Sequence, residues 1–361
     1  MNNELSTKPT TEKDWTDLGT TNFQEGEINI AIENFLYALT INPNYIDAQI
    51  GLGNCYYVQK KWDKALKYYR NVLEEIPQSL SIWLNLGNVY FELEQLDKAR
   101  DAFFKTIELK PDYAPSWYNL ARFYETTDIK KAIETYQKVL GFDPKYTSAY
   151  YNLGILYYKD GMFKEAIKSY EKALETDPNH LKAWLNLGIV YHDTGEIRKG
   201  ILTYERALKT LSEHPELWFA LGNLYYKQGS EEDLINAVKS YIKGLELAPD
   251  EPSGWSDLGG VHYKMGDLNK AIDYTQKALE VDPKYIKAWF NLGNIYYKKY
   301  IKETVLNDDL LEYKGYALWC FQEGAKLEDQ DSLHNEQILI KEGIEAIKPP
   351  FFLEYQPEEE E

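Results

Sequence analysis

The chain has 361 residues, and its 58 acidic against 40 basic side chains give a formal net charge of −18. This composition argues against nucleic acid and against membrane surfaces as partners, because phosphates need clustered lysine and arginine and anionic lipids repel acidic proteins. The only cysteines, Cys55 and Cys320, are too few for a disulfide framework, and no Cys/His spacing is typical of a metal site. Residues 1–15 lack the apolar core of a signal peptide and no long apolar run follows, which favours a cytoplasmic location, although a chain trimmed of its signal would read the same way.

One phrase returns about every 34 residues, from residue 12 to residue 329. Its first half combines tryptophan, leucine and glycine, as in Trp83-x-x-Leu86-Gly87, and a tyrosine usually follows three residues after the glycine. Its second half contains a small residue, such as Ala166, and most copies close with a proline. Self-similarity at this period is the signature of a solenoid, in which each repeat covers the apolar side of its neighbour.

These residues resemble the tetratricopeptide repeat (TPR) consensus over nearly the whole chain. The resemblance implies an all-α fold, a right-handed superhelical solenoid of helix-turn-helix repeats. We expect a disordered N-terminal segment 1–11, a capping helix over 330–347 and an acidic disordered tail over 348–361. The nine expected repeats are 12–45, 46–79, 80–113, 114–146, 147–180, 181–214, 215–251, 252–285 and 286–329.

Each repeat is numbered here from three residues before its tryptophan. Positions 4, 7, 8 and 11 then share one face of a first helix, A, and positions 20, 24, 27 and 28 mark a second helix, B. Glycine at position 8 and alanine at position 20 remove bulk where the helices cross, and leucine at position 7, such as Leu153, fills the space beside the crossing. A proline after helix B cannot continue it. Glycine at position 15 can adopt the left-handed conformation that often ends a helix, here helix A. It occurs at Gly161, Gly195, Gly229 and Gly266.

Four repeats depart from the period. Repeat 4 is one residue short at 126–128, and repeat 6 ends late, at 210–214. Repeat 7 has about three extra residues at 230–233. Repeat 9 contains the largest insertion, residues 300–311, which we expect to add helical turns or a loop before its helix B.

No enzyme motif is present, so we expect neither catalysis nor a cofactor. His262 takes the place of the tyrosine at position 11 and is expected in the core. His192 borders the groove, but no serine, cysteine or carboxylate motif surrounds it. Every recurrent glycine is explained by a helix crossing or a turn, which leaves no phosphate-binding loop.

The candidate binding surface is the groove that the A helices line, into which positions 2, 5, 6, 9, 12 and 13 project. Asparagine recurs at position 6, and its amide can pair with both main-chain groups of an extended peptide. The row is similar to the asparagine ladder in the TPR domain of O-GlcNAc transferase, whose catalytic half this chain lacks. Asparagine is also common at these positions in generic TPR repeats, so a merely solvated face is the alternative. The candidate groove residues are Asn85, Asn88, Tyr118, Asn119, Tyr151, Asn152, Lys159, Asn186, Asn223, Lys227, Lys264, Asn291, Asn294 and Lys298.

Aromatic and basic side chains flank the asparagines. Exposed aromatics at positions 5 and 12 would supply contact area for a ligand, although packing between adjacent A helices would also explain them. Lysines at position 13 favour a partner with an acidic segment, although they would also complement the helix dipole. The two-carboxylate clamp of the Hsp70 and Hsp90 co-chaperones needs arginine at position 6 of one repeat, and no repeat here has it.

The sequence therefore predicts a non-enzymatic protein–protein interaction scaffold that binds an extended peptide segment or a helix of a partner in its groove. The alternative is a structural subunit that contacts its neighbours through its ends and the 300–311 insertion. An apolar, projecting insertion would favour this alternative, and a polar, mobile one would favour groove binding.

Overall fold

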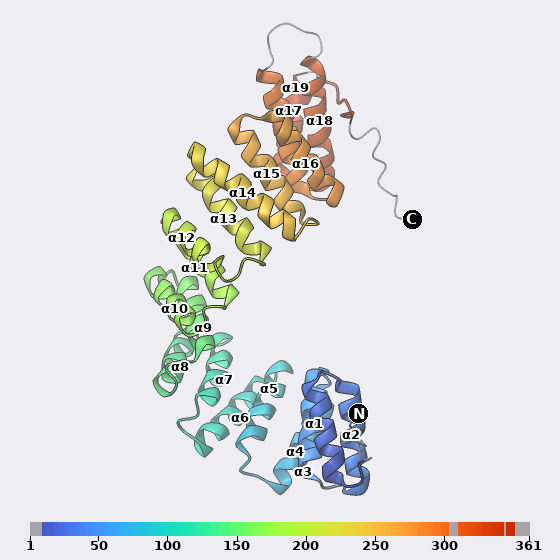
Figure 1. Ribbon diagram of the computed structural model, residues 1–361, viewed down its shortest axis with the longest axis vertical. Helices are drawn as coiled ribbons and strands as arrows, with labels where there is room; N and C mark the ends of the chain where they lie inside the picture. Colours follow the sequence, from blue (N-terminus) through green and yellow to red (C-terminus); the bar gives the residue numbers. More distant parts are fainter. Residues whose placement is uncertain (1–8, 303–309, 343, 351–361) are drawn as a thin grey trace, which may run out of the picture. The chain divides into compact units, whose positions relative to one another are not determined.

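The structure is a computed structural model that describes residues 9–302, 310–342 and 344–350, with the side chains of all but 310 and 311 (Figure 1). Every regular element in this part of the chain is an α-helix, which confirms the expected all-α repeat fold. The A helices are α1 (Glu12–Gln24), α3 (Ile46–Val58), α5 (Leu80–Glu92), α7 (Ala114–Glu125), α9 (Thr147–Lys159), α11 (Leu181–Asp193), α13 (Pro215–Gln228), α15 (Pro252–Met265) and α17 (Ile286–Lys302). The B helices are α2 (Ile28–Ile41), α4 (Trp62–Glu75), α6 (Leu96–Leu109), α8 (Ile129–Phe142), α10 (Phe163–Thr176), α12 (Ile197–Ala207), α14 (Glu231–Leu247), α16 (Leu268–Val281) and α18 (Leu310–Lys326), and α19 (Gln330–Lys341) follows them.

The chain divides into two compact bodies, Met1–Asp160 and Gly161–Glu361. The N-terminal body contains α1 to α9, and the C-terminal body contains α10 to α19. Within each body every A helix packs on the B helix that follows it, and every B helix packs on the next A helix. No helix in the described part of the chain is both long and apolar enough to cross a lipid bilayer.

Tryptophan at position 4 ties six of the A helices to the loop before them. The indole nitrogen of Trp83 donates to the carbonyl oxygen of Pro77 at 2.8 Å, and Trp289 donates to Pro283 at the same distance. Trp117, Trp184, Trp218 and Trp255 make the equivalent bond to the residue six positions earlier. In repeat 2, which lacks the tryptophan, the Gln49 amide replaces it and donates to Pro43 at 3.1 Å. This bond explains why tryptophan and proline recur together.

Glycine at position 8 makes room for an aromatic ring from helix B. A Cβ at Gly53 would come closer than 3.0 Å to the ring of Tyr69, and one at Gly87 would meet Phe103 in the same way. The ring at position 24 therefore lies directly beneath helix A, where a larger side chain would exclude it. The same crossing recurs in the C-terminal body, for example between Gly222 and Tyr241.

Leucine at position 7 is buried as expected in all repeats but the first. Leu153 is 3% exposed and belongs to a core cluster with Ala132 and Tyr136. Leu18 is 37% exposed, so the expectation that it fills the core is wrong. In the described residues no helix B of a preceding repeat lies beside α1 to cover it. His262 is packed in the core as expected, at 6% exposure and with its ring 5.2 Å from that of Tyr274.

The turns between the helices follow their glycines. Gly161 and Gly266 end their turns with φ of 73° and 84°, a left-handed conformation that favours glycine. The extra residues of repeat 7 lengthen helix B instead of forming a loop. Ser230 caps α14 by accepting from the Asp233 backbone N–H, and α14 has 17 residues where α16 has 14.

The C-terminal elements differ from expectation in their extent. In repeat 9, α17 continues to Lys302 and α18 begins at Leu310, and most of the 300–311 insertion (303–309) lies outside the described residues. The expected capping helix over 330–347 is too long, since α19 ends at Lys341. Residues 344–350 leave the helix because they run back along α18, where the backbone N–H of Ile347 donates to Gly315 at 3.0 Å.

The expected disordered ends lie mostly beyond the described residues. Residues 1–8 and 351–361 are outside them, so that part of the expectation is untested by the structure. Thr11 accepts from the Asp14 backbone N–H and caps α1, so the described part of the segment 1–11 is ordered next to the helix.

Candidate functional site

The candidate groove residues lie on the faces of the A helices that turn away from the crossing with helix B. In the N-terminal body they belong to α5, α7 and α9, and in the C-terminal body to α11, α13, α15 and α17. Leu86 and Leu120, on the opposite face of the same helices, are each 2% exposed. Most asparagines at positions 6 and 9 are half-buried instead. The asparagine amides on the groove face are therefore only partly accessible to solvent.

In repeats 2 and 3 a tyrosine hydroxyl from helix B fixes two of these amides. The ring of Tyr69 passes under Gly53, and its hydroxyl donates to Oδ1 of Asn54 at 2.8 Å. Nδ2 of Asn85, from the next A helix, donates to the same oxygen at 3.2 Å. The buried Tyr69 hydroxyl and the Asn85 amide thus share one acceptor, the side-chain oxygen of Asn54.

Repeats 4 and 5 repeat this arrangement with small changes. Nδ2 of Asn152 donates to the hydroxyl of Tyr136 at 2.8 Å and to that of Tyr118 at 3.3 Å. The Tyr118 ring also lies 5.0 Å from that of Tyr146, so this aromatic candidate is packed against the scaffold. Tyr151 is likewise half-buried, and it has interaction partners.

In the C-terminal body the same pairing links helices B and A. The Tyr241 hydroxyl donates to Oδ1 of Asn223 at 2.6 Å, and Nδ2 of Asn186 donates to Tyr170 at 3.4 Å. Burial raises the pKa of Tyr241 above its ordinary value, as it does for Tyr69 in the other body. The hydroxyls are therefore neutral, and each can donate to an amide oxygen or accept from an amide N–H.

Repeat 8 lacks an aromatic ring at position 24, where Thr275 stands. Ser256, which is fully buried, takes the place of the hydroxyl and accepts from Nδ2 of Asn291 at 3.0 Å. Beside it, Lys287 Nζ donates to Asp257 Oδ1 at 2.6 Å, and this carboxylate holds the lysine charged. The sequence analysis assigned no role to this ion pair, although positions 2 and 6 of successive repeats carry it.

Three asparagines of the candidate set have no hydrogen-bond partner in the described part of the chain. Asn119 is only 8% exposed, and Oδ1 of Asn88 is buried without a partner. Asn294 is half-buried. In all three cases the neighbouring residue at position 24 is a phenylalanine. It is Phe103 beside Asn88 and Asn119, and Phe321 beside Asn294. A phenylalanine at position 24 has no hydroxyl to offer, and the asparagines beside it form no hydrogen bond with the described residues.

Two of the four candidate lysines serve the scaffold. Lys264 Nζ donates to the carbonyl oxygen of Tyr226 at 2.9 Å and lies 4.6 Å from the centre of its ring. Lys298 Nζ likewise donates to the carbonyl oxygen of Tyr263 at 3.2 Å and lies 3.9 Å from the centre of its ring. A cation at this point complements the C-terminus of the preceding A helix. Lys159 and Lys227 are exposed and form no ion pair or hydrogen bond with the described residues.

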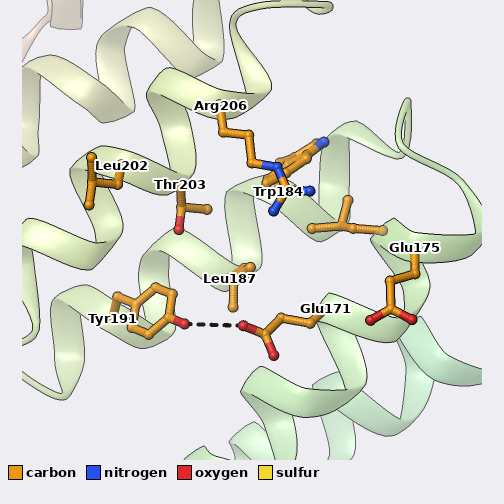
Figure 2. Close-up of a pocket in the computed structure, with 9 residues that line it drawn as sticks. Glu171, Glu175, Trp184, Leu187, Tyr191, Leu202, Thr203 and Arg206 are labelled. Atoms are coloured by element: carbon orange, nitrogen blue, oxygen red, sulfur yellow. Dashed lines mark hydrogen bonds between the residues drawn. The ribbon is translucent and has the colours of Figure 1, made fainter.

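A pocket of about 450 Å³ lies away from this face, on the C-terminal body between α10 and α12 and over α11 (Figure 2). Figure 2 shows the Tyr191 hydroxyl directed at Glu171, 3.5 Å away, with Arg206 beside the ring of Trp184. An equivalent pocket one repeat further on is lined by Trp218 and other residues of α12 to α14. The sequence analysis missed both pockets, although the recurring tyrosine at position 11 is a signal for them.

The described residues contain no group of three or more histidine, cysteine or acidic side chains that could hold a metal ion. Cys55 and Cys320 are buried, and burial raises the pKa of the Cys55 thiol to about 12, which leaves it protonated and unreactive. The groove and the pockets can form hydrogen bonds and apolar contacts, which is the chemistry of binding.

The repeats of this chain match models of a known protein family. Family models described as tetratricopeptide repeat or TPR repeat match residues 16–79, 59–122, 122–161, 147–180, 169–201, 215–251 and 261–299. A search of curated protein sequences found no match. Among solved structures, the C-terminal part of a TPR repeat-containing protein from Cytophaga hutchinsonii has a TM-score of 0.57 at 18% identity, over 70% of this chain and 98% of that one.

Two further solved structures are similar at lower TM-scores. YrrB, described as a TPR protein with an unusual peptide-binding site, is 25% identical over 53% of this chain and 97% of its own, with a TM-score of 0.45. MamA is 25% identical over 45% of this chain and 90% of its own, with a TM-score of 0.40. The likeness to the Cytophaga hutchinsonii protein shows a shared fold.

Proposed function

The chain belongs to the tetratricopeptide repeat family, and we propose that it binds an extended segment of a protein partner along the asparagine-bearing faces of its A helices. The fold is one that serves protein–protein interaction. The proposal adds which surface is used and what is recognised there, namely the main chain of the partner.

The observation that carries the proposal is the fixed position of the amides. Asn152 is held by the buried hydroxyl of Tyr136, and Asn223 by that of Tyr241. Nδ2 of Asn152 donates to Tyr136 and Tyr118, which leaves its oxygen for a ligand, and Oδ1 of Asn223 accepts from Tyr241, which leaves both of its N–H donors. Because the scaffold has already restricted these side chains, a ligand that pairs with them loses little of their conformational freedom.

Main-chain pairing suits an extended segment. Each peptide unit offers one N–H and one C=O, and an asparagine amide is complementary to both. Within each body, asparagines that recur once per repeat would meet successive stretches of such a segment. Recognition would then tolerate many side chains, with affinity summed over several repeats.

Exposed basic side chains at two places on the groove face favour a partner with acidic residues there. Lys159 on α9 and Lys227 on α13 are exposed and have no acidic partner among the described residues. The Arg122 guanidinium lies over the Phe91 ring at 5.2 Å, on the same face of the N-terminal body. In a chain with a net charge of −18, such unpaired cations favour a partner that brings its own carboxylates.

The test is a binding titration with a peptide selected on the full chain from a phage-displayed library of random dodecapeptides. Changing Asn119, Asn152 and Asn186 together to alanine should weaken binding by about a hundredfold or more. Each lost bond to a desolvated peptide group costs about 1–3 kcal/mol, and about 1.4 kcal/mol is a factor of ten in affinity. Asn152 and Asn186 also bond tyrosines, so we expect a modest fall in melting temperature as well.

The matched control changes three exposed residues on the B helices to alanine, Glu134, Lys168 and Arg198. This variant should bind the peptide as the wild type does. Equal affinity of the wild type and the asparagine variant, with both folded by circular dichroism, would contradict the proposal. Contacts at the ends and the 300–311 insertion would then become the better explanation.

A further inference from the structure

A pocket of about 540 Å³ lies in the last repeat, between α16 and α18 and over α17, and Pro350 stands at its edge. We propose that this pocket is the docking site of the chain's own C-terminal segment, with the phenyl rings of Phe351 and Phe352 as its occupants. This docking is independent of peptide binding in the groove. We call the space the terminal pocket.

The residues after α19 lead the chain to the terminal pocket. The backbone N–H of Ile347 donates to the carbonyl oxygen of Gly315 on α18 at 3.0 Å. A Cβ on Gly315 would come within 2.6 Å of the Ile347 side chain, so only glycine allows this approach. Pro349 is buried, and Pro350 lines the pocket itself. The chain is thus held against the scaffold up to the residue before Phe351.

Three tyrosines line the terminal pocket. The ring of Tyr296 lies 5.5 Å from that of Tyr316 and 6.4 Å from that of Tyr313, and Ile272 adds an aliphatic side chain. Burial raises the pKa of Tyr316 to about 12 and also raises the pKa of Tyr296, so both rings stay uncharged. Such a lining favours an aromatic occupant, because aromatic rings attract one another at centroid distances of roughly 4.5–7 Å.

The polar side chains around the tyrosines are already bonded to the scaffold. Glu312 accepts from the hydroxyl of Tyr316 at 2.9 Å, and Lys299 Nζ donates to Asn269 at 2.9 Å. Lys299 also lies 4.7 Å from the centre of the Tyr313 ring. The lining contains two carboxylates against one lysine, which disfavours an acidic occupant. Apolar contact is therefore the means of binding that the pocket offers.

The sequence after Pro350 has the composition that this lining requires. Four of the five residues 351–355 are aromatic or leucine, whereas residues 358–361 are all glutamate. High charge and low hydrophobicity keep a segment from burying apolar surface, a description that fits the glutamates but not residues 351–355. Phe351 follows Pro350 directly, and one residue spans at most about 3.6 Å, so its ring reaches the lining. The fixed φ of Pro349 and Pro350 also lowers the entropy that docking costs.

The location of Pro350 favours the chain's own segment over a partner as the occupant. The pocket over α11 and the pocket between α12 and α14 have the same plan, with a tyrosine at position 11, Tyr191 or Tyr225, between two B helices. Of these three pockets, only the terminal pocket has a residue from beyond α19 in its lining. The next residues along the chain are the two phenylalanines.

The test is limited proteolysis of the full chain with chymotrypsin, in which mass spectrometry follows cleavage after Phe351 and Phe352. Asp273→Trp, at an exposed position of α16 in the lining, puts a ring into the pocket and should release the segment. A docked segment is cleaved from its undocked state, so we expect cleavage about tenfold faster, the ratio that burial of one large apolar side chain supplies. The matched control is Glu280→Trp, at an exposed position of α16 outside the lining, and it should be cleaved as the wild type is.

A second variant opens the pocket instead of filling it. Tyr313→Ser removes one ring from the lining and should also speed cleavage, so the comparison stands if Asp273→Trp does not fold. Each rate is measured at several protein concentrations. Docking within one chain does not depend on concentration, whereas docking on a second copy does.

The outcomes decide between the possible occupants. Faster cleavage in both pocket variants at every concentration, with the wild-type rate in Glu280→Trp, would support docking within the chain. Equal rates in the wild type and the folded pocket variants would overturn it and leave the pocket to another partner. Protection that grows with protein concentration would also overturn it, because the segment of a second copy would then be the occupant.

Discussion

The crossing between helices A and B makes a sharp prediction about two glycines in the N-terminal body. Gly53 lies in α3, directly over the Tyr69 ring, while Gly141 lies in the last turn of α8 with nothing within 4 Å of an added Cβ. We expect Gly53→Ala to destabilise the protein relative to Gly141→Ala, although the chemical change is identical. Only the neighbourhood of the new methyl group differs.

The magnitude follows from two opposing effects. Alanine is favoured over glycine inside a helix by up to about 1 kcal/mol, which applies to both sites and less fully at the helix end. At Gly53 the new Cβ would come closer than 3.0 Å to the ring of Tyr69. That ring is 1% exposed and its hydroxyl is held by Asn54, so it cannot move freely. Overpacking of this kind costs about 1–3 kcal/mol, which is the expected difference between the variants.

The assay is urea unfolding followed by far-ultraviolet circular dichroism, with the two variants and the wild type side by side. Unchanged slopes of the transitions would show that the midpoints report stability. A third variant, Gly53→Ala with Tyr69→Leu, should lose less stability than the two single changes together, because the smaller side chain relieves the contact. If Gly53→Ala and Gly141→Ala had equal midpoints, the reasoning about the crossing would be refuted.

Three further changes test the core, the titration of a buried histidine and the C-terminal cap. Leu153→Ala should cost about 2–5 kcal/mol in unfolding free energy, and Leu18→Ala clearly less, since Leu153 is 3% and Leu18 37% exposed; equal costs would contradict the assigned core. Burial lowers the pKa of His262 in the folded protein below its ordinary value of 6.5. As the pH falls, the unfolded chain therefore binds this proton at a higher pH than the folded protein does, and the free energy of unfolding decreases below about pH 6.5. His262→Phe should therefore lose less stability between about pH 7 and pH 5 than the wild type in urea titrations; the same loss in both would contradict this assignment. Deleting residues 333–347 removes the buried Leu339 from its cluster with Trp289, and hydrogen exchange should then become faster in α17 and α18; unchanged exchange would show that α19 does not cap the repeat.

Much of the fold was predictable because its determinants are local. Trp83 finds its acceptor six residues earlier in Pro77, and Gly161 and Gly266 adopt the left-handed conformation that their place after helix A requires. The period of the repeat fixes which positions of each helix face the next one. The sequence also indicated which face of the A helices remains outside this packing.

The end of the chain was less predictable because its contacts are not periodic. The residues after Lys341 continue a helix-like sequence pattern, yet Ile347 pairs with Gly315 in α18. A helix running to residue 347 would lose this contact. Nothing in the local sequence announces a bond to a residue more than thirty positions earlier.

The state of each candidate groove residue was decided by tertiary contacts alone. Lys227 and Lys264 occupy the same position in successive repeats, but only Lys264 caps the helix before it. Asn54 and Asn88 both follow the glycine of the crossing, and by local sequence they are equivalent. One is bonded and the other is not, because the ring that crosses beneath them belongs to the next helix and is tyrosine at residue 69 and phenylalanine at residue 103. The sequence by itself determined the positions of the amides, and packing between helices determined which of them are hydrogen-bonded within the scaffold.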